Sequence, residues 1–101
     1  MSDNEQALCV PCVHLNGSGS DTLLKEYREV VEAFDELQLA LQRLTFHSRD
    51  YYVLGDDAWK VARDAETARR AMVSRCRDEY RQIMVGIRRQ IRDKERQREV
   101  R

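Results

Sequence analysis

The 101-residue chain has few of the residues that turns and sheets require, because it contains one proline, four glycines and seven aromatic residues. Sandwiches and barrels need frequent turns and many strand-forming side chains, so this composition disfavours them. Charged residues make up 36 % of the chain and apolar residues 42 %, which is typical of long exposed helices rather than of a disordered tail. We therefore predict a mainly α protein with a single domain.

Long hydrophobic runs are missing as well. No apolar stretch approaches the roughly seven residues of a signal-peptide core or the roughly 18 of a membrane span. We expect a cytoplasmic protein with no membrane partner. Cys9, Cys12 and Cys76 are an odd number of cysteines in a compartment that keeps thiols reduced, so no disulfide framework is expected.

Neither sign of charge is in excess, because 18 acidic and 18 basic residues cancel. The net charge therefore gives no reason to expect a nucleic-acid or membrane partner. The two halves nevertheless differ, since residues 1–50 carry nine acids and four bases and residues 51–101 carry nine acids and 14 bases. An acidic first half and a basic second half favour antiparallel association of two such chains.

Residues 1–17 are predicted to form an extended N-terminal arm. Their apolar stretch contains Pro11 between valines, which suits an extended segment and disfavours a helix. Turn-forming residues follow. A helix is expected to begin near them, capped by Ser18 with Asp21 three positions on, or instead by Ser20 or by Asp21 itself.

Residues 18–101 are predicted to fold as an antiparallel two-helix hairpin. The first helix covers about residues 21–45, where apolar residues recur every three or four positions, as in a coiled-coil seam. This seam consists of Leu23, Tyr27, Val30, Phe34, Leu37, Leu41 and Leu44. Residues 46–57 break the pattern and form the connection.

The second helix is predicted over about residues 58–98. Its apolar stripe consists of Ala58, Ala62, Ala65, Met72, Cys76, Tyr80, Ile83, Ile87 and Ile91. At 1.5 Å per residue this helix is about 60 Å long and the first about 37 Å, so its last turns are expected to lack a partner within the chain. Apolar side chains there would be exposed.

That exposed end predicts an interface between chains. The interface residues would be Ile83, Met84, Ile87 and Ile91. We expect a homodimer or higher oligomer, most simply two hairpins paired as a four-helix bundle.

Chemical motifs are weak. Nothing resembles a nucleophile with its base, a glycine-rich phosphate loop or a paired-carboxylate site, so neither enzymatic activity nor a cofactor is expected. Cys9 and Cys12 have the spacing of a metal-binding pair, but the other candidate ligands are scattered. We interpret them as ordinary reduced cysteines and predict no metal site.

Two segments are candidates for binding. In the connection, Arg49, Asp50, Tyr51 and Tyr52 could clamp a phosphate and stack on a base, together with His14 and Asn16 of the arm. Alternatively, the two tyrosines close the open end of the hairpin.

The C-terminal end is rich in arginine. Arg88, Arg89, Arg92 and Arg96 could contact a partner, or could instead form a solvated face favoured by the helix dipole. A nucleic-acid partner is not expected.

Two motifs resemble a group of small phage and prophage proteins. The first is Val13 to Ser18, similar to a V-H-I/L-N-G-T start, and the second runs from Arg49 to Gly55, similar to an N-G-R-D-Y-Y-x-x-G hairpin, with His47 and Ser48 in place of Asn and Gly. The resemblance covers about residues 12–84. It implies a phage origin and an accessory role.

The expected function is a phage-encoded, non-enzymatic anti-defence protein in the host cytoplasm. It would sequester a host immune signal, a cyclic or ADP-ribose-type nucleotide, between its subunits. One alternative is a protein-binding inhibitor of a host defence complex, similar to anti-CRISPR proteins. Another is a DNA-binding or scaffold accessory that uses the arginine-rich end.

Overall fold

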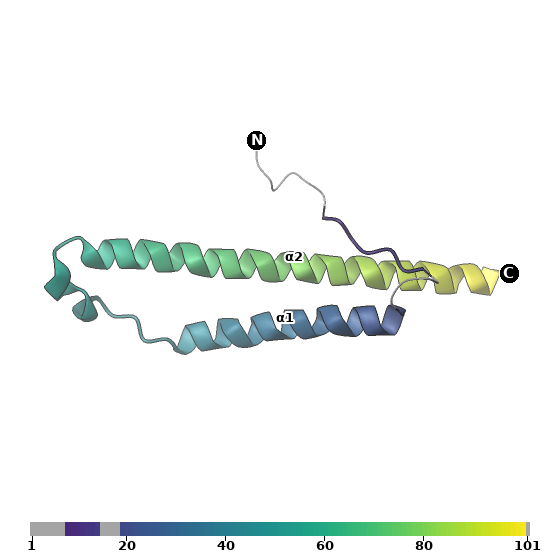
Figure 1. Ribbon diagram of the computed structural model, residues 1–101, viewed down its shortest axis with the longest axis horizontal. Coiled ribbons are helices and arrows are strands. Elements are labelled where there is room, and N and C mark those ends of the chain that lie inside the picture. The colour runs from purple at the N-terminus through teal and green to yellow at the C-terminus, as the bar shows by residue number, and fades with distance from the viewer. Residues whose placement is uncertain (1–7, 15–18, 101) are drawn as a thin grey trace, which may run out of the picture.

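The computed structural model describes residues 8–14 and 19–100. They form two long helices, α1 (Ser20–Arg43) and α2 (Ala58–Val100), joined by a connection with two short 3-10 turns, η2 (Ser48–Asp50) and η3 (Tyr52–Leu54). The helices pack side by side and antiparallel (Figure 1). No strand occurs in the described ranges. The mainly α fold and the pairing of two long helices are confirmed.

The start of α1 differs from the capping predicted. Gly19 occupies the N-cap position, and no side chain caps this helix end. Its carbonyl accepts a hydrogen bond from the Leu23 N–H at 2.9 Å. Ser20 and Asp21 lie inside the first turn, so predicting either as the cap was wrong, and Ser18 lies outside the described residues. Asp21 still favours this helix end, because a carboxylate stabilises the positive end of the helix dipole.

The contact between α1 and α2 combines aromatic rings with one ion pair. The Tyr80 ring lies 6.2 Å from that of Tyr27 and 5.7 Å from that of Phe34, measured between centroids. Arg77 Nε donates to Asp35 Oδ1 from the facing helix. These contacts fix the register of the hairpin.

This register makes the unpartnered end of α2 shorter than expected, because it moves residues 83–91 opposite α1. Ser20 precedes Asp35 by 15 residues, so at equal rise it lies opposite about residue 92 of α2. Met84 is 7 % exposed and Ile87 is fully buried within the chain. The excess length of α2 is divided between its two ends (Figure 1). About residues 93–100 extend beyond the start of α1, and about residues 58–68 lie beside the connection, because the chain leaves α1 in an extended conformation at Leu44 and runs on before it turns back.

Most of the predicted stripe on α2 is covered within the chain: Ile87 is fully buried, and Ala58, Ala62, Ala65, Cys76, Ile83 and Ile91 are half-buried. Met72 is 54 % exposed and Tyr80 is 38 % exposed, although both belong to that stripe. Tyr80 nevertheless packs on Tyr27 and Phe34 of α1. Arg70 and Arg77, which the stripe does not include, also contact α1.

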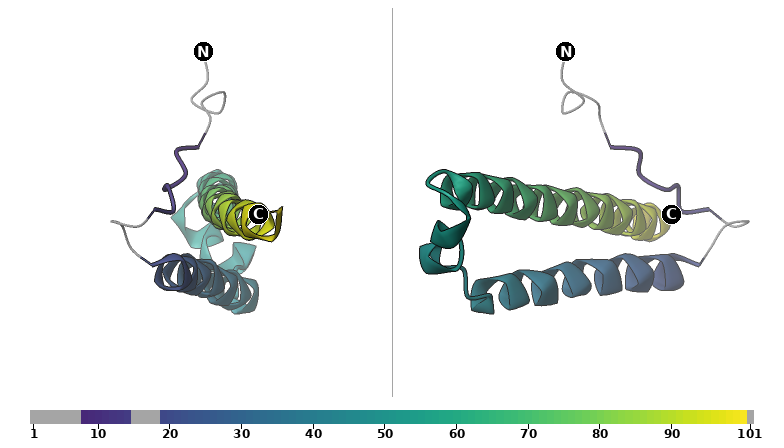
Figure 2. Two further views of the ribbon diagram at one scale, coloured as in Figure 1. Left: turned by 90° about the vertical axis from the view of Figure 1, so that its right-hand side faces the viewer. Right: turned by 60° about the vertical axis from the view of Figure 1, so that its left-hand side comes forward.

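The N-terminal arm covers the C-terminal part of α2. In residues 8–14 it has no regular secondary structure, and Figures 1 and 2 show it lying along this helix. The Gln90 side chain accepts from the Val13 N–H at 2.9 Å and donates to the Pro11 carbonyl at 2.8 Å, and Lys94 Nζ donates to the Val13 carbonyl. Val10 packs so closely on Gly86 that a Cβ there would lie 3.0 Å from a Val10 methyl. The arm therefore seals part of the apolar surface.

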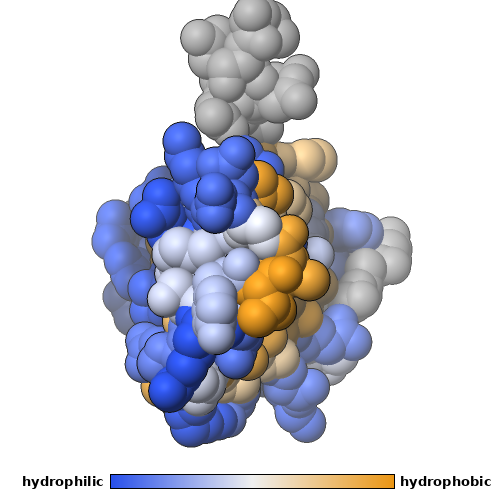
Figure 3. Space-filling model, turned by 90° about the vertical axis from the view of Figure 1, so that its left-hand side faces the viewer, coloured by the Kyte–Doolittle hydropathy of each residue, from blue (hydrophilic) through white to orange (hydrophobic). Residues whose placement is uncertain are grey.

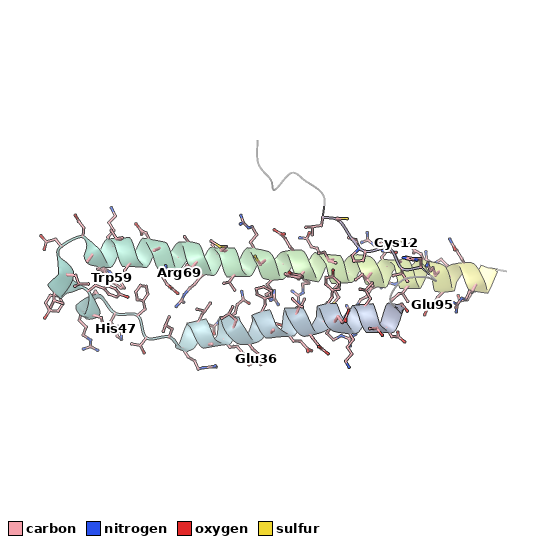
Figure 4. All side chains as sticks on the ribbon, in the orientation of Figure 1. Cys12, Glu36, His47, Trp59, Arg69 and Glu95 are labelled. Atoms are coloured by element: carbon pink, nitrogen blue, oxygen red, sulfur yellow. The ribbon has the colours of Figure 1, made fainter. Side chains whose placement is uncertain are left out.

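An aromatic cluster closes the other end of the hairpin. The Trp59 ring lies 4.9 Å from that of Phe46 and 5.8 Å from that of Tyr51, between centroids. Trp59 points from α2 towards the connection (Figure 4). Gly55 has φ of 128°, a conformation that only glycine adopts without strain, and it allows the chain to enter α2.

Ile87→Ala tests where the core lies. Loss of a fully buried side chain is expected to lower the free energy of unfolding by about 3 kcal/mol, measured in urea. Val85 is 43 % exposed on the same turn, so Val85→Ala is the matched control and should change it by less than about 0.5 kcal/mol. Equal effects would contradict the register described above.

Gln90→Ala tests the docking of the arm. The Val13 amide should exchange its hydrogen roughly tenfold faster, because its acceptor is lost. Nuclear magnetic resonance of the exchanging amide measures this. Gln82→Ala is the control, since Gln82 is exposed on α2 and makes no hydrogen bond in the described part of the chain. An unchanged Val13 rate in the Gln90 variant would rule out the docked arm.

Candidate functional site

The connection presents only part of the predicted binding cluster to solvent. Arg49 and Asp50 are exposed, and Tyr52 is 69 % exposed. Tyr51 is half-buried, with its ring 5.6 Å from that of Phe46. Tyr51 therefore closes the end of the hairpin, as the alternative interpretation proposed, and the other three side chains remain at the surface.

The structure does not bring the arm to the connection. His14 is exposed and follows Val13, which is bonded to Gln90 and Lys94 of α2. Asn16 lies outside the described residues. The molecule is 71 Å long, and the arm and the connection lie towards opposite ends (Figure 1). A site shared by His14 and Arg49 therefore needs two chains.

The residues predicted to form an interface between chains are largely buried by contacts within the single chain. Met84 and Ile87 are buried, and Ile83 and Ile91 are half-buried. The reason for placing an interface there, exposure beyond the end of α1, does not hold. Arg88, Arg89, Arg92 and Arg96 are all exposed, as predicted for either interpretation of the arginine-rich end.

The cysteines do not cluster. Cys9 and Cys12 are exposed on the arm, and Cys76 is half-buried near the middle of α2. Within residues 8–14 and 19–100, no group of three or more His, Cys, Asp or Glu side chains is placed to hold a metal ion. Neither helix of this described part is long and apolar enough to cross a membrane.

One side of the hairpin carries an exposed apolar face, which we define by Leu37, Leu44, Val61 and Met72. They are 42 %, 53 %, 66 % and 54 % exposed, respectively. Leu37 and Leu44 are seven residues apart, and Val61 and Met72 are eleven apart, so each pair lies on one side of its helix.

The ion pair between Asp35 and Arg77 shows that both pairs lie on the same side of the hairpin. Leu37 lies about 160° around α1 from Asp35, and Met72 lies about 140° around α2 from Arg77. The ion pair therefore marks one edge of the helix contact and the apolar face the other. Figure 3, viewed from the connection end, shows hydrophobic residues gathered on one side and hydrophilic residues on the other.

The opposite side carries a cleft that the sequence interpretation missed. It lies between the end of α1, the start of the connection and α2, and has a volume of about 480 Å³. We call it the cationic cleft. It is lined by Gln42, Arg43, Leu44, Thr45, Phe46, His47, Arg63, Glu66, Thr67 and Arg70.

Glu66 organises the arginines beside this cleft. Its Oε1 accepts from Arg69 Nη2 and its Oε2 from Arg70 Nε, both at 2.9 Å. These hydrogen bonds, first from Arg70 and then from Arg69, lower the pKa of Glu66. Arg70 Nη2 also donates to the Leu41 carbonyl at 3.0 Å. Arg70 is therefore held in place by both helices.

The arginines on this side of the hairpin have a regular spacing that is visible in the sequence. Arg63, Arg70 and Arg77 are seven residues apart, so they form one row along α2. The hydrogen bond that Arg77 donates to Asp35 raises the pKa of Arg77, and Arg70 contacts α1 at Leu41. Arg63 lies beyond the end of α1. A search for charged residues at heptad spacing would have found the row, but the cleft also depends on the path of the connection.

No protein-family model, curated protein or solved structure matches this chain. The features that bear on its function are therefore the apolar face, the exposed connection and the cationic cleft.

Proposed function

We propose that this chain is a non-enzymatic binding protein that acts as a homodimer, with the apolar faces of two hairpins packed together as a four-helix bundle. The apolar face is the observation that carries the proposal. It is formed by both helices, and its side chains are between 42 % and 66 % exposed in a single chain. A second copy offers the same face in return, as a symmetric interface requires.

The large solvent-accessible area of the single chain supports a dimer. It measures 8334 Å², whereas a compact monomer of 11.9 kDa exposes about 5,900 Å². Its radius of gyration is 20.2 Å, against about 13 Å for a compact domain of this length. Among the described residues, the buried apolar side chains are Val13, Val31, Met84 and Ile87. A core of this size is small for an independent fold, and dimerisation would enlarge it.

The side of the hairpin that carries the apolar face is large enough for a specific interface, because it continues past Met72 as far as Tyr80, which is 38 % exposed. Residues 61–80 of α2 extend over about 30 Å, and two helices side by side are about 20 Å wide. Two opposed faces of this size would bury about 1,200 Å² in total, which is at the lower end of the range for specific interfaces. The arm limits the area, because it covers the end of α2 beyond this segment.

The geometry disfavours the expected nucleotide site shared by Arg49, Tyr51 and His14. Tyr51 is engaged with Phe46 and Trp59, and His14 lies far from Arg49 in the same chain. The proposal includes an anti-defence role in phage infection, and this role is supported by the two sequence motifs alone. In the second motif, the glycine at position 55 is explained by the structure, because its φ is positive.

Leu37→Glu tests the dimer by sedimentation velocity at micromolar concentration. The unchanged chain should sediment with the mass of two chains. The variant should have the mass of one, because its carboxylate would be buried without a partner. Leu39→Glu is the matched control: Leu39 is 47 % exposed, close to the 42 % of Leu37, but lies across α1 from it.

The control variant should remain a dimer. A monomeric unchanged chain would overturn the proposal. So would a control that dissociates as readily as Leu37→Glu, because the interface would then not be the apolar face.

A further inference from the structure

The row of arginines along α2 ends at a position where α1 no longer supplies a partner. Arg77 donates to Asp35, and Arg70 donates to the Leu41 carbonyl and to Glu66. Arg63 comes next in the row, but α1 has already ended at Arg43. Its nearest carboxylate is that of Asp64, at 3.7 Å, and both side chains are more than half exposed. An ion pair of this kind in solvent contributes little, so the Arg63 guanidinium is available to a ligand.

Arg43 brings a second available guanidinium to the same place. It lies in the last turn of α1, is exposed and forms no ion pair within the described residues. Together with Arg63 and Arg70 it lines the cationic cleft, whose one carboxylate, Glu66, already accepts hydrogen bonds from Arg69 and Arg70. The cleft therefore has an excess of positive charge.

Further hydrogen-bonding groups complete the lining. Gln42, Thr45 and His47 border the cleft, and the Thr67 hydroxyl, which donates to the Arg63 carbonyl at 3.0 Å, keeps its oxygen free to accept. A volume of about 480 Å³ lies within the range of small-molecule sites. Phe46 connects the cleft to the aromatic cluster, since its ring lies 4.9 Å from that of Trp59.

We propose that the cationic cleft binds a phosphate-bearing small molecule, a nucleotide or another organic phosphate, through Arg43 and Arg63, with Arg70 as a fixed third cation. Arginine suits this ligand because its planar guanidinium donates two parallel hydrogen bonds to phosphate oxygens. Glu66 holds Arg70 in position for it. Leu44 belongs both to the apolar face and to the lining of the cleft, but Arg63 and Arg70 lie on the other side of the hairpin from that face, so the proposed contacts with phosphate do not depend on the dimer.

Isothermal titration calorimetry of the full chain with ATP, pyrophosphate and adenosine tests the proposal. ATP and pyrophosphate should bind and adenosine should not, because the cleft recognises phosphate. If ATP binds more tightly than pyrophosphate, the ligand is a nucleotide, and similar affinities indicate a site for phosphate groups alone. The fluorescence of Trp59, the one tryptophan of the chain, should change on binding of pyrophosphate, since Phe46 links it to the cleft.

Arg43→Gln and Arg63→Gln provide the decisive comparison. Each should weaken ATP binding about tenfold or more by removing charge-assisted hydrogen bonds. Arg75→Gln is the matched control, because Arg75 is an exposed arginine of α2 that does not line the cleft, and it should bind as the unchanged chain does. Circular dichroism of each variant confirms that the helices are intact.

Three results would overturn the proposal. They are the absence of ATP binding by the unchanged chain, equal losses in Arg63→Gln and Arg75→Gln, and binding of adenosine as tight as that of ATP. Failure here leaves the sedimentation result for the dimer unaffected, so the two proposals are tested separately.

Discussion

A hairpin of two helices has a single line of contact, and the rest of this structure depends on how the apolar side chains beside that line are covered. At the C-terminal end of α2 the arm covers them, held by the Gln90 side chain and by the close approach of Val10 to Gly86. At the other end, Phe46, Tyr51 and Trp59 cover one another. Between these ends the apolar face is left open, and a second copy of the chain is the partner that we propose for it.

The helices could be predicted from the sequence because apolar spacing reports which side of a helix is buried. α1 ends two residues earlier than expected, and α2 ends two residues later. The register of α1 against α2 could not be predicted, because it depends on how far residues 44–57 extend before the chain turns back. An error there placed all of the excess length of α2 at its C-terminal end, although much of it lies beside the connection, and made Met84 and Ile87 seem exposed.

The binding residues were predictable only in part, for a related reason. The break in the apolar pattern correctly indicated the connection at residues 46–57, but composition could not distinguish Tyr51, which packs inward, from Tyr52, which is exposed. The cationic cleft depends on the early end of α1, so its residues come from three segments that no local pattern joins. Asp35 and Arg77 were also missed, because charged residues were assigned to the solvated faces of both helices.

The two sides of the hairpin have different roles in this account. One side has the apolar side chains that stability requires, and the other has the charged groups that recognise a ligand. This division explains how a chain with a small core of its own can leave a cleft open, because the missing core is supplied by association.

Small-angle X-ray scattering on an absolute intensity scale tests the proposed association most directly. Two hairpins packed face to face should have the mass of two chains and a radius of gyration of about 22 Å, close to the 20.2 Å of one hairpin, because helix layers lie only about 10 Å apart. The mass of a single chain would contradict the account. So would a two-chain mass with a radius of gyration near 40 Å, the value expected roughly for two hairpins of this length joined end to end.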